Sequence, residues 1–451
     1  MKPHREKRLK PTGLLFISIL AVTYSFAEGA QKPLTLREAI NFALESSPLM
    51  DSAKKTRSIR DLEYKSSVAK MLPSLDFATT NGIQNYIPFS STTTLLTPNP
   101  TDPWYSTLSL GITENLYDNG ASLTNSKIAD LKRRLESINY LKARDDLVLN
   151  ITEEFYRYSL AIILLDVRKQ QQAILDKQFK TLANQYHQGF KTKSDFLRLK
   201  TQVQQAEIDQ TIAENSIALS LNELHRLVGS NLNDNVSLSF EAVPVRQDQK
   251  YIFPKTPPAF ENIYDSKITK IQQNINEKSV DLVQRNYWPQ ALVTSGVTYE
   301  NSSYINSGQP FNAGNQLSWT ALLTLQYNIW DWGTRKRDLE VAEYNRDIQQ
   351  DSLNQNLQDA KSKIANLMAD LLRIDRNFSL GQELITLEEE SHRNMETQYR
   401  EGKVSYLDFI TSLNDLLSAR VQFYTVYFDA LQNMAKYRYY EGTIYENTVE
   451  K

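Results

Sequence analysis

The 451-residue chain contains no cysteine. This absence excludes disulfide bonds, thiolate metal sites, a thiol nucleophile and a lipid-modified N-terminal cysteine. Histidine is rare, and the four residues are isolated from one another at His4, His187, His225 and His392. Neither a glycine-rich phosphate loop nor a G-x-S-x-G nucleophile turn occurs. The sequence therefore predicts no enzyme, no metal site and no cofactor.

Glycine is scarce, with 14 residues, and both glycine and proline are absent from residues 121–186. An uninterrupted helix over that range is about 98 Å long at a rise of 1.5 Å per residue. Gly189 in QYHQGF is the expected helix stop. A second helix is predicted over 334–399, with Gly402 as its stop in QYREGK. Helices of this length exceed what a single soluble core needs.

Long apolar runs are also missing. Residues 14–22 are apolar, but a helix needs about 20 such residues to cross a bilayer. A basic segment precedes this run and the pattern Ser-Phe-Ala follows it, so we expect a signal peptide, residues 1–27. Cleavage is expected after Ala27, with Ala30 as a second site and an uncleaved membrane anchor as the alternative. The remaining 46 basic and 52 acidic residues give a net charge near −6, which argues against nucleic acid as a partner.

Two strand-to-helix junctions stand out among the features that are present. Residues 316–329 alternate between an apolar, aromatic face and a short polar face, and only Leu322 breaks the pattern. This alternation predicts an amphipathic strand, which runs through DWG at Gly333 into a charged helix. Residues 104–117 show the same alternation and run through YDNG at Gly120 into a second charged helix. The two glycines are 213 positions apart, which indicates an internal repeat.

The remaining elements follow the same plan. Period-two alternation predicts strands over 74–87 and 290–300. Shorter helices are expected over 35–71, kinked or restarted at Pro48, and over 193–228, 260–287 and 404–440. The helix 404–440 shows coiled-coil spacing. Its seam consists of Tyr406, Ile410, Leu413, Leu417, Tyr424, Tyr427, Leu431 and Met434.

The chain accordingly divides into two structural repeats. The first repeat covers 28–228, a linker covers 229–259, the second repeat covers 260–442, and a frayed tail covers 443–451. The short helices of each repeat sum to roughly the length of the long one. We therefore expect them to lie end to end, antiparallel to the long helix. The predicted fold class is mainly α, with long antiparallel coiled-coil helices and four amphipathic strands at one end.

Four strands cannot close a barrel, because single-chain outer-membrane barrels start at eight strands. An open sheet edge in lipid leaves unpaired backbone groups that cost several kcal/mol each. The strands must then be pooled with those of other copies. Two copies supply eight strands, and three supply twelve. The polar strand faces favour a wet interior and hence three copies.

The repeated junction, the opening LTLREAINFAL and the two YxxG turns, each with an aspartate six positions after the glycine, resemble the TolC-type outer-membrane efflux proteins. The resemblance covers residues 34–442. It implies a homotrimer with a 12-stranded transmembrane barrel continuous with an α-helical periplasmic tunnel. It also implies docking to a periplasmic adaptor and an inner-membrane pump. The implied function is a passive exit duct for efflux or type I secretion, and the cargo stays open between drugs, metal ions and polypeptides.

The resemblance also implies site residues. The helix turns form the periplasmic mouth, shaped by Tyr186, Gly189, Tyr399 and Gly402 as candidate adaptor contacts. Asp195 and Asp408 match acidic positions at the constriction. Rings of acidic side chains select for cations. The alternative for both aspartates is an ordinary helix N-terminal charge, favoured by the helix dipole.

The sequence departs from the family pattern near the second turn. A second acidic position is occupied by Thr411, and a basic position by Val404. Asp415 follows Asp408 by seven residues but does not match a motif.

Tryptophans mark the strand ends. Four of them are candidates for a membrane-interface belt in contact with outer-membrane lipid, with ordinary core packing as the alternative; they are Trp104, Trp288, Trp330 and Trp332.

A soluble periplasmic coiled-coil scaffold or adaptor is the competing function. It explains the helices and the signal peptide, but it leaves four amphipathic strands unexplained.

Overall fold

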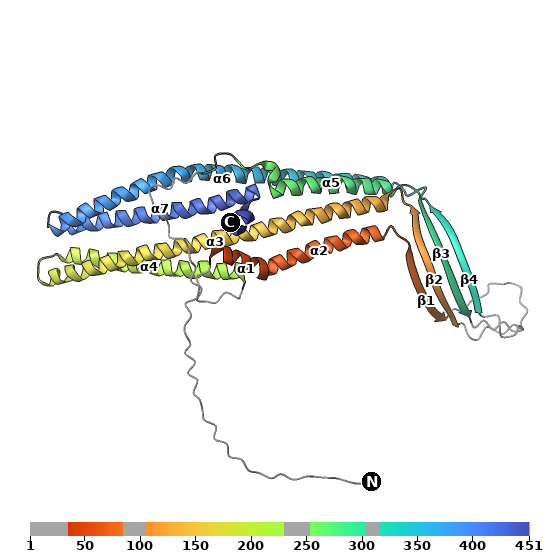
Figure 1. Cartoon of the computed structure of the whole chain (residues 1–451), viewed down its shortest axis with the longest axis horizontal. Coiled ribbons are helices and arrows are strands. Elements are labelled where there is room, and N and C mark those ends of the chain that lie inside the picture. Colours follow the sequence, from red (N-terminus) through yellow and green to blue (C-terminus); the bar gives the residue numbers. More distant parts are fainter. Residues whose placement is uncertain (1–34, 84–103, 230–252, 303–314, 451) are drawn as a thin grey trace, which may run out of the picture.

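The computed structural model describes residues 35–83, 104–229, 253–302 and 315–450. The predicted signal peptide, most of the linker and the strand residues 84–87 lie outside the described residues. The described chain forms a long slab of helices with a four-stranded sheet at one end (Figure 1). The mainly α fold with four strands is therefore confirmed. None of the helices in the described ranges is long and apolar enough to cross a membrane.

Two helices of 67 residues each run the length of the slab, α3 (Ala121–His187) and α6 (Thr334–Arg400). At 1.5 Å per residue each spans about 100 Å. The shorter α4 (Lys193–Val228) and α7 (Tyr406–Glu441) fold back on them through the two glycine turns. All four bounds keep the offset of 213 between the repeats.

The other short helices lie along the long helices, as expected. α2 (Pro48–Ala69) packs on α3, and α5 (Tyr264–Arg285) packs on both α3 and α6. Pro48 starts a new helix after α1 (Leu36–Ser46), because it occupies the first helical position, where no intrahelical N–H bond is needed. α5 begins later than predicted, after the short helix η1 (Phe260–Asn262).

The helix α7 is buried on more sides than its heptad seam predicts. Ile410, Leu413, Leu417 and Tyr427 of that seam are buried, but so are eight residues outside it: Phe409, Ser412, Leu416, Ala419, Phe423, Phe428, Ala430 and Ala435. The reason is that α7 packs against α3 as well as α6. Phe423, which is 1 % exposed, takes the place expected for the half-buried Tyr424. A heptad describes contact with one partner helix, so it misses the second contact face.

The sheet is antiparallel with the strand order β1-β2-β3-β4. Its strands are β1 (Ser74–Ile83), β2 (Trp104–Tyr117), β3 (Gln290–Ser302) and β4 (Asn315–Gln326). The register aligns Phe77, Leu110, Val297 and Trp319 in one row, and all four are exposed. The neighbouring row, Ala78, Ser109, Thr298 and Ser318, lies on the opposite face. One face is therefore mainly apolar and the other mainly small and polar, although Leu292 and Leu322 lie on the polar face and Asn81, Glu114 and Ser295 lie on the apolar face.

Two predictions about segment ends are wrong. β4 ends at Gln326, so Tyr327 and Ile329 lie beyond the strand in the irregular approach to α6. The alternation continues there without strand pairing, because β3 pairs with β4 only as far as Gln326. The tail after residue 442 does not fray at its start: Ile444 is fully buried in the core with residues of α1 and α3. Tyr445 packs against the same core, so both side chains hold the segment against the helices.

The repeated strand-to-helix junction has a hydrogen-bonding cause. Asp118 accepts hydrogen bonds from the backbone N–H groups of Gly120 (2.9 Å) and Ser122 (2.7 Å) at the start of α3. Asp331 does the same for Gly333 (3.0 Å) and Arg335 (3.1 Å) at the start of α6. These N–H groups have no partner within the helix, so a carboxylate there satisfies them.

Candidate functional site

The two hairpin turns lie together at the end of the slab opposite the sheet (Figure 1). Gly189 and Gly402 have positive φ angles of 80° and 73°. In each turn the glycine N–H donates to a tyrosine carbonyl at 3.0 Å, that of Tyr186 or Tyr399. The left-handed conformation favours glycine because it has no Cβ. The sequence prediction placed all four residues at the turns, and they do lie there.

The tyrosine rings point into the hairpins. Tyr186 stacks on Phe196 with centroids 5.0 Å apart and an interplanar angle of 19°, and Tyr399 stacks on Phe409 at 5.0 Å and 13°. Both tyrosines are half-buried. Sequence reasoning missed Phe196 and Phe409 as their partners. The signal was available, because each phenylalanine follows a candidate gate aspartate directly and keeps the 213 offset.

Asp195 and Asp408 cap their helices. The Asp195 carboxylate accepts from the Thr192 hydroxyl at 2.8 Å, and the Thr192 oxygen accepts from the Asp195 N–H at 3.1 Å. Asp408 and Ser405 repeat this capping box at 2.7 and 3.2 Å. The helix N-terminal role is therefore present in both repeats. Asp408 is exposed and Asp195 is half-buried, so both carboxylates also face solvent.

A groove of about 500 Å³ separates the two tips. It is lined by Ser194, Leu197, Arg198, Thr201 and Gln202 of α4 and Leu407 of α7. In the first turn, four residues before Ser194, the Phe190 side chain is 77 % exposed, whereas the equivalent position in the second turn is Lys403. Exposed aromatic residues are enriched at protein contact surfaces. Neither Phe190 nor Leu407 was among the predicted contact residues.

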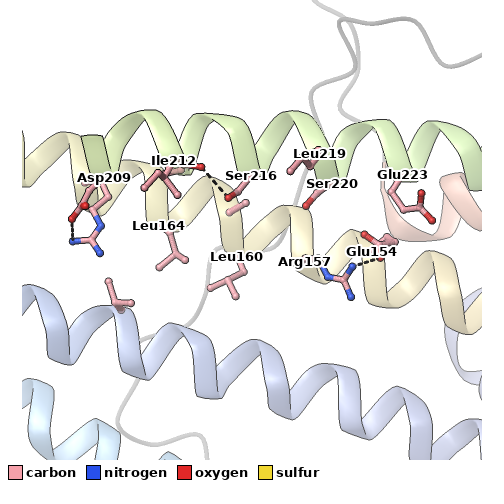
Figure 2. Close-up of a pocket in the computed structure, with 14 residues that line it drawn as sticks. Glu154, Arg157, Leu160, Leu164, Asp209, Ile212, Ser216, Leu219, Ser220 and Glu223 are labelled. Carbon is pink, nitrogen blue, oxygen red and sulfur yellow. Dashed lines mark hydrogen bonds and ion pairs between the residues drawn. The ribbon is translucent and has the colours of Figure 1, made fainter. Parts of the chain in front are cut away.

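A larger trough of about 670 Å³ lies midway along the hairpin, on α3 and α4 with Val421 of α7 at its border (Figure 2). Its walls are apolar, and an ion pair stands at each end. Arg157 binds Glu154 at 2.5 Å, and Arg168 approaches Asp209 at 3.4 Å. Burial raises the pKa of the Glu154 carboxyl above its ordinary value, although Arg157 opposes this. Ile212 and Leu219, at the rim of the trough, are 60 % and 67 % exposed.

Exposed apolar side chains also run along both long edges of the slab. One edge is formed by α2 and α4 and the other by α6 (Figure 1). The first edge carries Ile59 and Leu62 on α2 and Ile208, Ile212 and Leu219 on α4. The second edge carries Val341, Tyr344, Ile348, Leu380 and Leu387 on α6. Each of these side chains is more than half exposed, so each stripe is a candidate contact surface.

The two edge stripes lie at matching heights. On α2, Ile59 is ten residues from the sheet end of the helix, and on α6, Tyr344 is also ten residues from the sheet end. On α4, Ile208 is 15 residues from the tip, and on α6, Leu387 is 13 residues from the tip. At 1.5 Å per residue the paired levels agree to within about 3 Å.

Three of the four candidate interface tryptophans lie at the helix end of the sheet. Trp330 and Trp332 make a T-shaped pair with centroids 5.7 Å apart and are 71 % and 81 % exposed; Trp288 is 61 % exposed. Trp104 begins β2 at the other end of the sheet, opposite Ile83 in the register. The three described side chains are thus not packed in a core of this chain.

The histidines that remain after the N-terminal segment are dispersed. His187 contacts the Tyr186 ring at the first tip, His225 lies near the C-terminal end of α4, and His392 packs on Phe409 in the second hairpin. Within the described residues no group of three or more histidine, aspartate or glutamate side chains could hold a metal ion.

Comparison with known proteins identifies the family. The family model for outer membrane efflux proteins matches residues 39–230 and 269–436, which is most of the chain. The chain therefore belongs to the outer membrane efflux protein family.

Individual relatives are distant. The cation efflux system protein CusC of Escherichia coli (strain K12) is 21 % identical over 288 residues, which cover 61 % of this chain and 59 % of CusC. The outer membrane protein TolC of Vibrio cholerae is 20 % identical over 318 residues, 68 % of this chain and 67 % of that protein. The match thus spans about three fifths of CusC and two thirds of TolC.

Solved structures share the fold over nearly the whole chain. The CmeC outer membrane channel of Campylobacter jejuni has a TM-score of 0.77 at 12 % identity, covering 97 % of this chain and 94 % of that one. The outer membrane protein VceC of Vibrio cholerae has a TM-score of 0.75 at 16 % identity, covering 90 % and 96 %. At these identities the likeness concerns the fold.

Proposed function

We propose that the protein is the outer-membrane exit duct of a tripartite efflux or type I secretion system. In this proposal the duct is a passive conduit without catalytic activity. The observation that carries the proposal is the four-stranded sheet, which is apolar on one face, polar on the other and unpaired at both edges within the described residues. Such a sheet is stable in lipid only when its edges are closed by further strands. The helices of about 100 Å extend from it into the periplasm.

The closing strands come from identical copies in a homotrimer, giving twelve strands with the small polar side chains toward the lumen. Two features support a head-to-tail ring. The free edges of β1 and β4 adjoin α2 and α6, so the sheet edges and the helical edges lie on corresponding sides (Figure 1). The apolar stripes of α2–α4 and of α6 stand at matching heights. Contacts between two different edges generate closed rings when the rotation closes.

The hairpin tips are the proposed periplasmic mouth and the contact with an adaptor protein, which in turn engages an inner-membrane pump. Support comes from the groove between the tips and from the exposed Phe190 side chain in the first turn. Tyr186 and Tyr399 contribute by holding the turns through their stacked rings, and Gly189 and Gly402 by allowing the positive φ angles. Trp288, Trp330, Trp332 and Trp104 are proposed to border the apolar sheet face at its two ends.

The native mass of the mature protein, extracted from outer membranes in mild detergent, tests the duct directly. We expect three chains per particle in the outer-membrane fraction, because three copies supply the strands that enclose a polar lumen. A particle of one or two chains recovered in soluble periplasmic extract would instead identify a scaffold or adaptor and remove the barrel.

We further propose that Asp408 and Asp195 form acidic rings at the mouth. Asp408→Asn removes the charge but keeps an oxygen that accepts hydrogen bonds from Ser405. It therefore tests the effect of the charge without removing the helix cap. In planar-bilayer recordings we expect this variant to prefer cations over anions less than the natural protein does. Asp415→Asn, which removes an exposed charge one heptad further on, is the matched control. Equal ion selectivity in all three proteins would exclude a gating charge at Asp408.

A further inference from the structure

The two hairpin tips differ at one packed pair of side chains. In the first hairpin Phe179 of α3 packs on Phe196 of α4 with ring centroids 5.4 Å apart. In the second hairpin the equivalent contact joins His392 of α6 to Phe409 of α7, also at 5.4 Å. The interplanar angles are 33° and 30°. An imidazole therefore occupies the place of a phenyl ring with the same geometry.

A second exchange accompanies the first. Leu199, fully buried in the first hairpin, is replaced in the second by Ser412, which is 6 % exposed. The Ser412 hydroxyl donates to the Phe409 carbonyl at 2.8 Å and lies 3.0 Å from His392 Nδ1. Since its only proton is used on the carbonyl, the hydroxyl oxygen must accept from Nδ1–H. The neutral imidazole then has its free lone pair on Nε2, where a second proton would add.

Few charges surround this imidazole. Glu396 lies on the same helix, and Arg420 faces it from α7, where it is held by Glu389 at 2.8 Å. Burial lowers the pKa of His392 below its ordinary value; Glu396 opposes this and Arg420 reinforces it. The contacts favour the neutral ring, because its flat face lies on Phe409 in a half-buried site.

We propose that His392 and Ser412 make the α6–α7 tip sensitive to mild acid, while the α3–α4 tip with Phe179 and Leu199 is not. Protonation at Nε2 creates a charged imidazolium that gains by moving toward water, which weakens its packing on Phe409. Phe409 in turn stacks on Tyr399 at the turn. Resting on the proposed function, the consequence is that acidification of the periplasm loosens the half of the mouth that carries Asp408.

The direction with pH follows from the lowered pKa. The folded state holds fewer protons on His392 than the unfolded state does. The neutral imidazole therefore makes its full contribution to the stability of the folded tip above the ordinary histidine pKa of about 6.5. It is lost as the pH falls below that value, until the folded state is protonated as well.

Hydrogen–deuterium exchange of the full mature protein in mild detergent tests the proposal. Exchange is compared at about pH 7.5 and about pH 5.5, on either side of the ordinary histidine pKa, after correction for intrinsic exchange. We expect peptides from the α6–α7 tip to lose protection several-fold at the lower pH, and peptides from the α3–α4 tip to keep theirs. The double variant His392→Phe with Ser412→Leu, which copies the first hairpin, is expected to abolish the response.

The internal repeat offers matched controls. Phe179→His with Leu199→Ser should transfer the acid response to the first hairpin, and His187→Phe, at the exposed tip histidine, should leave the natural response unchanged. His392→Phe alone serves where the double variant does not fold. An equal response in both hairpins, or a response that survives His392→Phe, would overturn the proposal. If acid increases hydrogen–deuterium exchange at the tip but does not change the channel conductance, the acid-sensitive contact is retained. In that case the proposed role of this tip as the mouth of a duct is rejected.

Discussion

Replacing Ile212 and Leu219 together by glutamate is expected to eliminate most of the three-chain particle in mild detergent. Both side chains are more than half exposed in the single chain and belong to the apolar stripe on α4. Burying an isoleucine or leucine contributes about 1.5–3 kcal/mol, and a charge placed in the same contact adds a desolvation cost. The substitution is repeated at each of three contacts in the ring. Native mass of the detergent-extracted protein measures the result.

The reciprocal edge provides the control for that experiment. Leu380→Lys with Leu387→Lys on α6 should disrupt the particle in the same way, because the proposed ring pairs the α4 edge of one copy with the α6 edge of the next. Combining Ile212→Glu on α4 with Leu380→Lys on α6, which lie 19 and 20 residues from the tip, should restore part of the three-chain particle through opposite charges. The exchange Ile212→Leu with Leu219→Ile keeps the apolar area and should leave the mass unchanged. Trimers that persist in both charged variants would contradict contact between these edges.

Asp145→Ala is expected to destabilise the fold by about 3 kcal/mol, because it leaves the buried Tyr264 hydroxyl and the half-buried Arg144 guanidinium without their acceptor. The Asp145 side chain is fully buried in α3. It accepts from the Tyr264 hydroxyl of α5 at 2.6 Å and from Arg144 Nε at 2.8 Å. The Arg144 guanidinium lies over the Tyr445 ring at 4.1 Å, so the same group also holds the C-terminal segment.

Asp265→Ala is the matched control for this contact between α3 and α5. Asp265 binds Lys142 at 2.7 Å, but both side chains are about one third exposed, at 33 % and 31 %. Ion pairs with this access to solvent contribute at most about 1 kcal/mol. Chemical unfolding followed by helical circular dichroism compares the two variants with the natural protein. Equal losses of stability in both would mean that burial of Asp145 is not what makes its contact strong.

The local sequence pattern was sufficient to predict the helices, the strands and the internal repeat. The absence of glycine and proline over residues 121–186 predicted α3 to within one residue, because an uninterrupted helix is a property of a single segment. Period-two alternation predicted all four strands for the same reason. It failed at Ile329, since the end of a strand depends on pairing with a neighbour and not on alternation.

The functional surface was only partly accessible to the same reasoning. The glycine turns and the capping aspartates lie within a few residues of each other, so their spacing revealed them. The stacking of Tyr399 on Phe409, ten residues further along the chain, required the hairpin to close. Whether the capping aspartates also act as a gate depends on other copies of the chain and stays a prediction.

The sequence by itself determined the long helices, the amphipathic strands, the offset of 213 and the family, because each is written in contiguous residues. The tertiary structure decided which helices share which faces. It buried α7 against two partners, set His392 on Phe409, joined Asp145 to Tyr264 across 119 positions and brought the apolar stripes of two edges to the same height. Those contacts depend on distances between segments remote in the chain, and the periodicity within one segment contains no measure of such distances.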